Sequence, residues 1–391
     1  MPEPVNSVTE AVAKDGRVLW LSDTYGDKNG ISTALKAIHR EIRLRNLPVD
    51  LLVCGKSLQS EDHLIVLKPV SQFTLPLYRN QPLRIPNILQ ILRVFRRGNY
   101  TRVVCSTEGP MGWAALYLKR KFSVETSFFL HTDWITFARE VLSMEQPGLK
   151  RLERILKVYY RRFSNIIVLN ADQQQWLTGD VMAFAPSRVF RSAHWADAMF
   201  TPLPFGSQKE YPFNLQRPVV LFTGRLSKEK GVFELPGIFR LIRNIFPEMQ
   251  MVVAGTGPDE EELRKLMPEA CFLGWVSHEA LPSLFHASDI LLLPSRFDTF
   301  SCVALEALSC GLPVAAYNTK GPKDIIQDNV NGFLTETPEE MAGKVVRFFL
   351  DPGIRMEMKK AARLRAETYQ AGPIMDRLLY DIGVITETNY A

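Results

Sequence analysis

Short apolar runs alternate with amphipathic stretches along the first half of the chain. Apolar runs at 17–22 and 49–54 predict buried strands, and the apolar residues of 31–45 recur at helical spacing. Further strands are predicted at 101–105, 126–130 and 165–169, and further helices at 88–95, 112–121, 149–162 and 172–177. Strands that alternate with helices form βαβ units, so this half predicts a parallel sheet covered by helices.

The same alternation resumes after a proline-rich break. Residues 200–218 contain four prolines and no periodic apolar pattern, which predicts a linker at 201–217. Beyond it, strands are predicted at 219–224, 249–255, 271–275, 289–294 and 313–317, with helices at 232–245, 259–266, 279–287 and 302–309.

The chain is therefore predicted to hold two Rossmann-like, doubly wound α/β domains, at 1–200 and 218–370. Residues 371–391 predict a C-terminal helix, with a return to the first domain as one option. Ligands of doubly wound sheets bind outside the carboxyl ends of the strands. We therefore expect the active site in a cleft between the two domains.

The composition is typical of a globular protein, with 46% hydrophobic and 23% charged residues in a chain of 391. No apolar run reaches the roughly 18 residues of a membrane-spanning helix. The polar N-terminal stretch lacks the apolar region of a signal peptide, so we expect a cytoplasmic protein. The five cysteines are scattered without zinc-like spacing, which predicts buried free thiols.

Positive charge is concentrated in the first half. Residues 1–200 carry 27 Lys and Arg against 18 Asp and Glu, a net +9, whereas the remainder carries 20 against 24, a net −4. The helix at 150–162 has a basic face with aromatic residues, which suits an anionic membrane, although a helix that covers a domain core shows the same pattern. Peripheral membrane contact is favoured by further cations at Arg93, Arg96, Arg97, Arg102, Lys119, Arg120 and Lys121.

Two segments of the second half carry candidate chemistry. Arg225 and Lys230 follow the strand at 219–224, where a helix is predicted to begin. Two cations beside a helix N-terminus suit a diphosphate, although an exposed basic loop would look the same.

The second segment follows the strand that ends at Pro294. Asp298 lies in the loop, Ser301 is a suitable N-cap, and Glu306 lies in the apolar helix that begins at Cys302. A carboxylate in so apolar a helix needs a partner. We therefore favour the binding of sugar hydroxyls, ribose hydroxyls and a phosphate over the alternative of a local cap and a surface residue.

Four motifs, in this order and spacing, resemble the donor domain of family 4 retaining glycosyltransferases, which have the GT-B fold. They are TGRLSKEKG at 223–231, AGTGPDEEEL at 254–263, FLGWVSHEAL at 272–281 and LLLPSRFDTFSCVALEALSCGLPV at 291–314. Within that family the chain resembles the lipid-directed branch, which contains sulfoquinovosyl-diacylglycerol synthase and glycolipid mannosyl- and glucosyltransferases. The agreement covers about residues 17–35 and 72–335.

By this resemblance, Arg225 and Lys230 would bind and neutralise the donor diphosphate, and Glu306 would hold the ribose hydroxyls. The remaining donor contacts would come from Phe300, Ser301, Cys302 and Val303 at the phosphates, and from Trp275 and Val276 at the base. Asp298 would contact the transferred sugar and is one methylene shorter than the usual Glu, which leaves the donor open.

A second departure lies at 319–324, where Thr-Lys-Gly-Pro-Lys-Asp replaces the Gly-Gly-x-x-Glu of many relatives. The added Lys320 and Lys323 suit a more anionic donor or acceptor, or else are surface charge.

Four residues of the first half complete the resemblance. Gly30 resembles the glycine that lets the backbone approach the donor phosphate, and His131 would lie beside the reacting sugar. Glu108 and Trp134 are candidate acceptor contacts. A turn glycine and a structural histidine are the alternatives for the first two.

The implied reaction is hexosyl transfer with retention, from a UDP- or GDP-sugar to a hydroxyl of a glycolipid or cell-envelope glycan precursor. We expect no cofactor, no metal and no nucleic acid, and a place in the cytoplasm at the inner face of the membrane. The alternatives are a non-catalytic sugar-nucleotide-binding or membrane-adaptor protein, and a UDP-sugar epimerase.

Overall fold

The computed structural model describes residues 16–27, 29–75, 78–140, 142–202 and 211–385. The chain divides into two compact units. The first contains Met1–His131, Lys150–Ala193 and Ala371–Ala391, and the second contains Thr132–Leu149 and His194–Gln370. Three predicted segments lie partly outside the described residues. They are the N-terminal stretch predicted to lack a signal peptide, the predicted linker and the predicted C-terminal helix.

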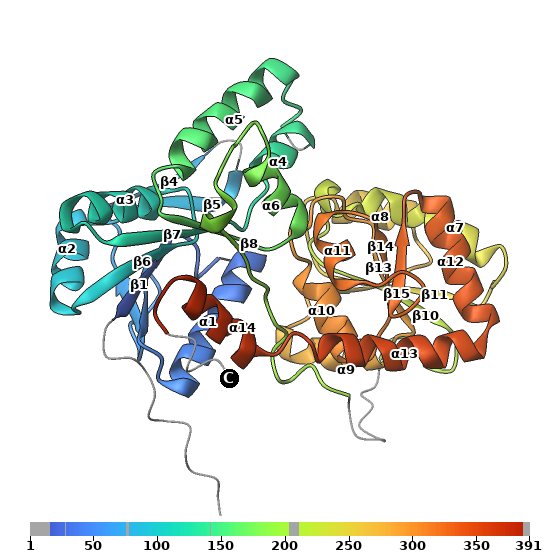
Figure 1. Ribbon diagram of the computed structural model, residues 1–391. Coiled ribbons are helices and arrows are strands. Elements are labelled where there is room, and N and C mark those ends of the chain that lie inside the picture. The colour runs from blue at the N-terminus through green and yellow to red at the C-terminus, as the bar shows by residue number, and fades with distance from the viewer. Residues whose placement is uncertain (1–15, 28, 76–77, 141, 203–210, 386–391) are drawn as a thin grey trace, which may run out of the picture. The chain divides into compact units, whose positions relative to one another are not determined.

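In the described part of the first unit, seven parallel strands form a sheet in the order β3-β2-β1-β6-β7-β8-β9 (Figure 1). The strands are β1 Arg17–Ser22, β2 Val49–Cys54, β3 Leu64–Leu67, β6 Tyr100–Cys105, β7 Glu125–Phe129, β8 Asn165–Val168 and β9 Val189–Arg191. An antiparallel pair is formed by β4 Ser71–Leu75 and β5 Tyr78–Ile85. The helices are α1 Gly30–Arg45, α2 Ile88–Arg97, α3 Pro110–Phe122, most of α5 Gln146–Tyr160, α6 Ala171–Thr178 and α14 Ala371–Asp381.

In the second unit, six described strands form a parallel sheet in the order β12-β11-β10-β13-β14-β15. The strands are β10 Val219–Thr223, β11 Gln250–Ala254, β12 Cys271–Gly274, β13 Ile290–Leu293, β14 Val314–Tyr317 and β15 Gly332–Thr335. The helices are α4 Trp134–Glu140, α7 Leu235–Arg243, α8 Glu260–Leu266, α9 Leu281–His286, α10 Cys302–Ser309, α11 Lys320–Ile325, α12 Pro338–Leu350 and α13 Pro352–Ala366.

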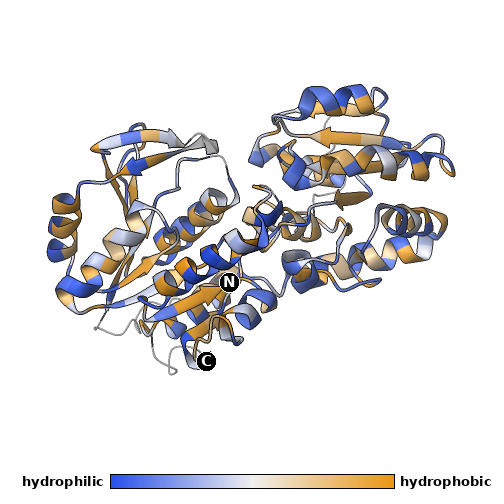
Figure 2. Ribbon diagram, turned by 90° about the horizontal axis from the view of Figure 1, so that it is seen from above, coloured by the Kyte–Doolittle hydropathy of each residue, from blue (hydrophilic) through white to orange (hydrophobic). Residues whose placement is uncertain are grey.

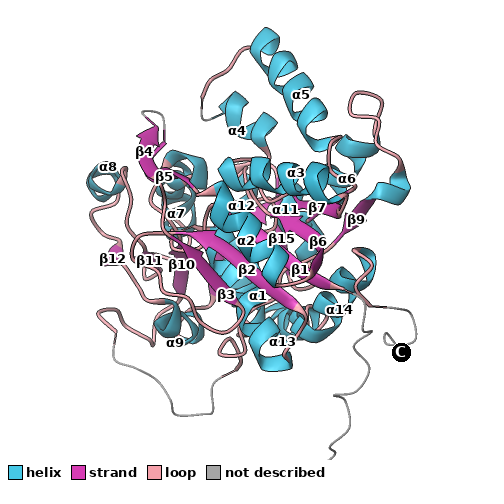
Figure 3. Ribbon diagram, turned by 90° about the vertical axis from the view of Figure 1, so that its left-hand side faces the viewer, coloured by secondary structure: helices cyan, strands magenta, loops and turns pink. Residues whose placement is uncertain are grey.

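The prediction of two doubly wound α/β sheets is confirmed. Strands such as β2 and β10 are buried along their whole length because helices cover both faces of a parallel sheet. They are accordingly orange in Figure 2, whereas the helices carry both colours. Figure 3 separates the strands from the helices that surround them.

Some elements differ from the prediction. Sequence analysis missed β3, β4, β5, β9, β15 and the helices α4, α11, α12 and α13. The helix predicted at 232–245 is divided into a 3₁₀ turn, Val232–Glu234, and α7. All five cysteines are free, as predicted, but Cys271 and Cys302 are half-buried rather than buried.

Each sheet has a point where its strand order reverses, between β1 and β6 in the first and between β10 and β13 in the second. Loops that leave neighbouring strands in opposite directions open a crevice there, at the carboxyl ends of the strands. The residues that follow β1, β6, β10 and β13 therefore lie where a ligand can enter.

Asp23 joins the two loops at the reversal point of the first sheet. The hydroxyl of Thr107 donates to Asp23 Oδ2 at 2.6 Å, and the Met111 N–H at the start of α3 donates to Oδ1 at 3.1 Å. A Cβ on Gly109 would lie 2.5 Å from Asp23 Oδ2, so the approach requires glycine. Burial raises the pKa of Asp23 to about 6, against the opposing hydrogen bonds from Thr107 and Met111.

A similar close approach joins the loop after β10 to the end of β13. Gly231 has a φ of +71°, and a Cβ there would lie 1.9 Å from the carbonyl oxygen of Pro294. Only glycine combines the left-handed backbone with this lack of bulk. The adjoining 3₁₀ turn, Lys228–Lys230, is thereby fixed beside the loop that follows β13.

Replacing Gly231 with alanine is expected to destabilise the second unit by about 2–4 kcal/mol, through backbone strain and overlap with Pro294. Gly343→Ala is the control, since Gly343 lies within α12 and a Cβ there meets nothing within 4 Å. That variant should gain roughly 0.5–1 kcal/mol. Urea unfolding measures both, and equal stability of the two variants would contradict the packing argument.

The stability difference between the wild type and Asp23→Asn should depend on pH. Since the folded state raises the pKa of Asp23 from 3.8 to about 6, it holds a proton that the unfolded chain releases between these values. The contribution of Asp23 is thus present at low pH and is lost as the pH rises to about 6.

Asparagine removes this titration, so the wild type should lose about 2–2.5 kcal/mol relative to Asp23→Asn between pH 4 and pH 7. Urea unfolding at pH 4, 5, 6 and 7 measures this difference in stability. The pH-dependent contributions of the other carboxylates are the same in both proteins and cancel in the difference. A difference that is flat or rises with pH would refute the buried, protonated carboxyl.

Candidate active site

The basic segment that contains Lys230 and the acidic segment that contains Asp298 contact each other in the structure. Lys230 Nζ lies 2.5 Å from Asp298 Oδ1, which joins the loop after β10 to the loop after β13. The Asp298 carboxylate holds the pKa of Lys230 above its ordinary value, outweighing burial, which acts to lower that pKa. Lys230 is thus a fully charged cation at the reversal point of the sheet.

Arg225 is the second cation of this edge. It lies between β10 and the 3₁₀ turn, with its side chain 40% exposed and 3.9 Å from Glu229. Such a long contact at the surface binds a guanidinium weakly, so Arg225 can turn to an incoming anion at little cost.

The loop from Asp298 to the start of α10 differs from the predicted helix cap. Ser301 occupies the N-cap position, but its backbone is left-handed, with a φ of 67°, and its side chain makes no capping hydrogen bond. The prediction that Ser301 caps through its hydroxyl is therefore wrong. The first N–H groups of α10, from Cys302 onward, consequently lack that side-chain acceptor.

Phe300 and Cys302, on either side of Ser301, both contact the interior of the unit. The Phe300 ring is buried, 5.1 Å from the ring of His194 and 6.0 Å from that of Tyr369, so it packs inside the unit. Burial, with help from Glu306 and Asp298, raises the pKa of the Cys302 thiol to about 12. Cys302 is therefore no thiolate nucleophile at neutral pH.

Glu306 has a partner that sequence analysis did not predict. Its side chain is 9% exposed, and its Oε1 lies 3.0 Å from Nε2 of His278. His278 is not among the residues that sequence analysis assigned to the site. Trp275 and Val276 lie on the same segment, after β12, and the Trp275 side chain is 63% exposed.

Lys320 in the departing segment is not simply surface charge. It forms an ion pair with Asp133, and its Nζ donates to Thr136 Oγ1 at 3.0 Å. Asp133 also accepts from the Thr136 N–H at the start of α4. Lys320 therefore ties α11 to α4 within the second unit.

The loop that leads to Gly30, the first residue of α1, is anchored in the first unit. Arg84 on β5 forms a two-pronged ion pair with Asp27, with contacts of 2.8 and 3.3 Å. The Asn29 side chain accepts from the Ser32 N–H and so caps α1. A Cβ on Gly30 would meet nothing within 4 Å, so protein packing does not require glycine at this position.

Glu108 follows β6, which pairs with β1 in the first sheet, and His131 follows β7, which pairs with β6. The hydroxyl of Tyr160 donates to Glu108 Oε1 at 2.7 Å. His131 is buried, with its ring 4.4 Å from that of Phe129. Trp134 begins α4 in the second unit, and its buried Nε1 has no hydrogen-bond partner among the described residues.

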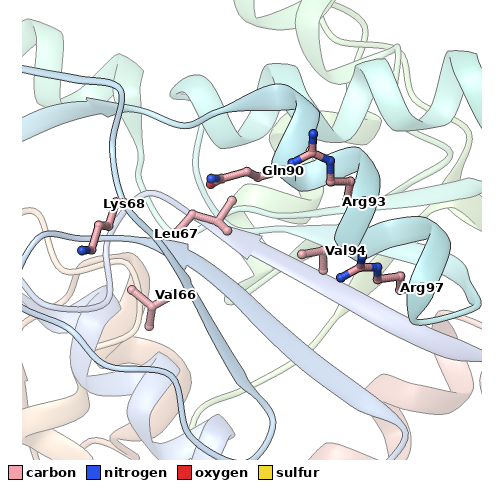
Figure 4. Close-up of a pocket in the computed structure, with 7 residues that line it drawn as sticks. All are labelled: Val66, Leu67, Lys68, Gln90, Arg93, Val94 and Arg97. Atoms are coloured by element: carbon pink, nitrogen blue, oxygen red, sulfur yellow. The ribbon is translucent and has the colours of Figure 1, made fainter.

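A pocket of about 370 Å³ lies elsewhere in the first unit, between the end of β3 and α2 (Figure 4). It is lined by Val66, Leu67, Lys68, Gln90, Arg93, Val94 and Arg97. None of the predicted donor or acceptor residues lines it, although Arg93 and Arg97 belong to the predicted basic charge.

The described residues contain neither a cluster of metal ligands nor a membrane-spanning helix. No group of three or more His, Cys, Asp and Glu side chains in these ranges is placed to hold a metal ion. No helix in the same ranges has the length and apolar character needed to cross a membrane.

Two family descriptions match the chain. Residues 28–190 match the family described as Glycosyltransferase Family 4, and residues 207–365 match that described as Glycosyl transferases group 1. The first match covers the predicted acceptor residues and the second covers the donor motifs.

Individual relatives agree with these families. Alpha-D-kanosaminyltransferase of Streptomyces kanamyceticus is 34% identical over 173 residues, 41% of this chain and 44% of that protein. Sulfoquinovosyl transferase SQD2 of Arabidopsis thaliana is 27% identical over 315 residues, 76% of this chain and 59% of that protein. The chain thus spans about half the length of these relatives.

The fold agrees as well. The structure of HepE from Anabaena in complex with UDP has a TM-score of 0.72 at 17% identity, covering 94% of this chain and 100% of that one. The two family matches, the motifs that they contain and this shared fold lead to one conclusion: the chain belongs to the group 1, family 4 glycosyltransferases of the GT-B fold.

Proposed function

We propose that the chain transfers a hexosyl group from a nucleoside diphosphate sugar to an acceptor hydroxyl, with retention at the anomeric carbon. The observation that carries the proposal is the pairing of Lys230 with Asp298 at the start of α10, where a charged ammonium and a carboxylate face the same ligand edge. The ammonium suits the diphosphate, and the carboxylate suits the hydroxyls of the sugar.

Departure of the nucleoside diphosphate is the demanding step, because negative charge grows on the leaving phosphate oxygen. Lys230, Arg225 and the N–H groups at the start of α10 supply positive charge at that place. The bond between the anomeric carbon and the phosphate oxygen breaks, and a bond to the acceptor oxygen forms on the same face. The acceptor proton passes to the leaving phosphate, so the reaction balances without a separate protein base.

Asp298 is the counter-ion of Lys230 in the structure. A donor phosphate that binds Lys230 would release Asp298 to accept hydrogen bonds from the sugar hydroxyls. The shorter Asp298 would set which hexose fits, and His131 and Gly30 of the first unit would contribute to the sugar and phosphate contacts. Glu306, Trp275 and Val276 would bind the nucleoside, with UDP and GDP as the candidate nucleotides.

The acceptor side is proposed to use Glu108 and Trp134, with a glycolipid or a cell-envelope glycan precursor as substrate. The relative SQD2, a sulfoquinovosyl transferase, supports a lipid-directed role, and the basic first half supports an anionic surface. We place the enzyme at the cytoplasmic face of a membrane.

The face shared by α3 and α5 supports this membrane contact. Trp113 and Val158 are 55% and 58% exposed, and the Arg162 guanidinium lies 5.8 Å from the Trp113 ring centroid. Val158 lies in α5, and Arg162 lies in the turn directly after it. Exposed aromatic and aliphatic groups beside cations suit the interface of an anionic bilayer.

Other cations of the first unit support it less. Lys119 donates to the carbonyl of Arg162, Lys157 to that of Val181, and Arg161 to those of Met182 and Ala183. These side chains form hydrogen bonds within the unit. The net charge of residues 1–200 includes them, although they are less available to a membrane surface.

Lys230→Ala should lower kcat/KM by about 100- to 1000-fold, because it removes a cation from the developing phosphate charge. Release of nucleotide and formation of product, with UDP- and GDP-hexoses and a lipid extract as acceptor, measure the effect. Lys265→Ala is the control, since Lys265 is 71% exposed and pairs with Glu261 on α8. Transfer that survives in Lys230→Ala at the level of the control would exclude this donor site.

The same assay separates the alternative functions. A non-catalytic binding protein would bind the nucleotide sugar but release no free nucleotide, whereas an epimerase would convert the sugar without an acceptor. Either result would contradict the proposed transfer reaction.

The double variant Trp113→Ala, Arg162→Ala should bind anionic vesicles several-fold more weakly, since one interfacial cation contributes about 1 kcal/mol. Sedimentation with phosphatidylglycerol vesicles measures this, and phosphatidylcholine vesicles and high salt should abolish wild-type binding. Leu44→Ala is the control, because Leu44 is 76% exposed on α1, outside this face. Equal binding of all three proteins would remove the assignment of the face.

A further inference from the structure

The contact between His278 and Glu306 joins two segments that both belong to the nucleoside end of the proposed donor site. His278 follows Trp275 and Val276 after β12, and Glu306 lies in α10. Their Nε2 and Oε1 atoms are 3.0 Å apart. Nothing in the reaction chemistry proposed above uses His278.

Burial makes this contact energetically important. The Glu306 side chain is 9% exposed, and its helix neighbours Leu305 and Ala307 are fully buried or nearly so. An ionised carboxylate in such surroundings is costly unless a donor meets it. An imidazole that carries a proton on Nε2 donates to Oε1 and satisfies that oxygen.

The imidazole itself is held in place by aromatic packing. The Phe200 ring meets the His278 ring edge to face at 4.9 Å, and Phe200 is 2% exposed. Phe200 in turn packs on Phe285 of α9 at 5.9 Å. The orientation of the imidazole is therefore fixed before any ligand arrives.

A hydrogen bond to Oε1 fixes the orientation of the Glu306 carboxylate, and this orientation also fixes the position of Oε2. We propose that His278 is a positioning residue for donor recognition. By engaging Oε1 of Glu306 it leaves Oε2 to accept a hydrogen bond from a ribose hydroxyl, and so selects ribonucleoside diphosphates. This inference rests on the proposed function, in which Glu306 holds the ribose.

The test compares ligands that differ only at the ribose. Binding of UDP, GDP and their 2′,3′-dideoxy analogues is measured by calorimetry on the full chain. His278→Ala should weaken the ribonucleoside diphosphate that the wild type binds by about tenfold, and the dideoxy analogue by less than about twofold. In transfer assays, the donor KM should rise while kcat at saturating donor changes by less than about twofold.

Three further variants separate positioning from a general structural effect. His278→Gln keeps an N–H donor and should recover part of the lost affinity. His286→Ala is the matched control, because His286 Nε2 lies 2.9 Å from the carbonyl oxygen of Thr201 in the same unit. In a Glu306→Ala background, His278→Ala should change affinity by less than about twofold, since the two residues act through one contact.

Equal weakening of the ribo and dideoxy ligands by His278→Ala, or a full effect in the Glu306→Ala background, would overturn the inference. Should His278→Ala fail to fold, the ligand comparison is made on His278→Leu, which fills similar space without an N–H donor. Loss of ribose discrimination in that variant, with the affinity of the His286→Ala control intact, supports the inference, and unchanged discrimination refutes it. A wild type that binds neither UDP nor GDP would instead refute the proposed function.

Discussion

The contact of Gly231 with the Pro294 carbonyl is the constraint on which the donor side of the molecule depends. Loops that leave β10 and β13 diverge at the reversal point of the sheet, and nothing in the strand order alone brings their side chains together. With no side chain and a left-handed backbone, Gly231 lets one loop lie directly on the other. The ammonium of Lys230 can then reach Asp298, although 68 residues separate them in the chain.

Buried carboxylates at the two reversal points follow a common rule, because each has a specific donor. Lys230 meets Asp298, His278 meets Glu306, and Thr107 with the start of α3 meets Asp23. Desolvation makes an unpaired carboxylate costly, so each pairing also fixes the position of a loop. Rigid loops with charged ends are what a polar ligand with phosphates and hydroxyls requires.

The sequence was sufficient for the fold, because alternating strands and helices are local patterns. Apolar runs located β1, β2 and β10, and Lys230 and Asp298, which the sequence singled out for a donor site, form an ion pair between the loops after β10 and β13. Contacts between residues far apart in the chain could not be predicted from the sequence. Lys320 meets Asp133 across 187 residues, and His278 meets Glu306 across 28, with no periodicity to reveal either contact. Ser301 was misjudged because residue type suggests a cap, whereas the left-handed backbone decides against it.

The composition of the first unit has a consequence for how the chain is made. Its core includes α14, whose Asp376 meets Arg45 of α1 across 331 residues, with the second unit encoded between them. During synthesis the sheet around β1 emerges early and must wait for α14, while the segment His194–Gln370 can complete its own sheet first. The unit whose first strands are translated first is thus completed by a helix that follows the second unit in the chain, and α1 lacks the cover of α14 until that helix has been synthesised.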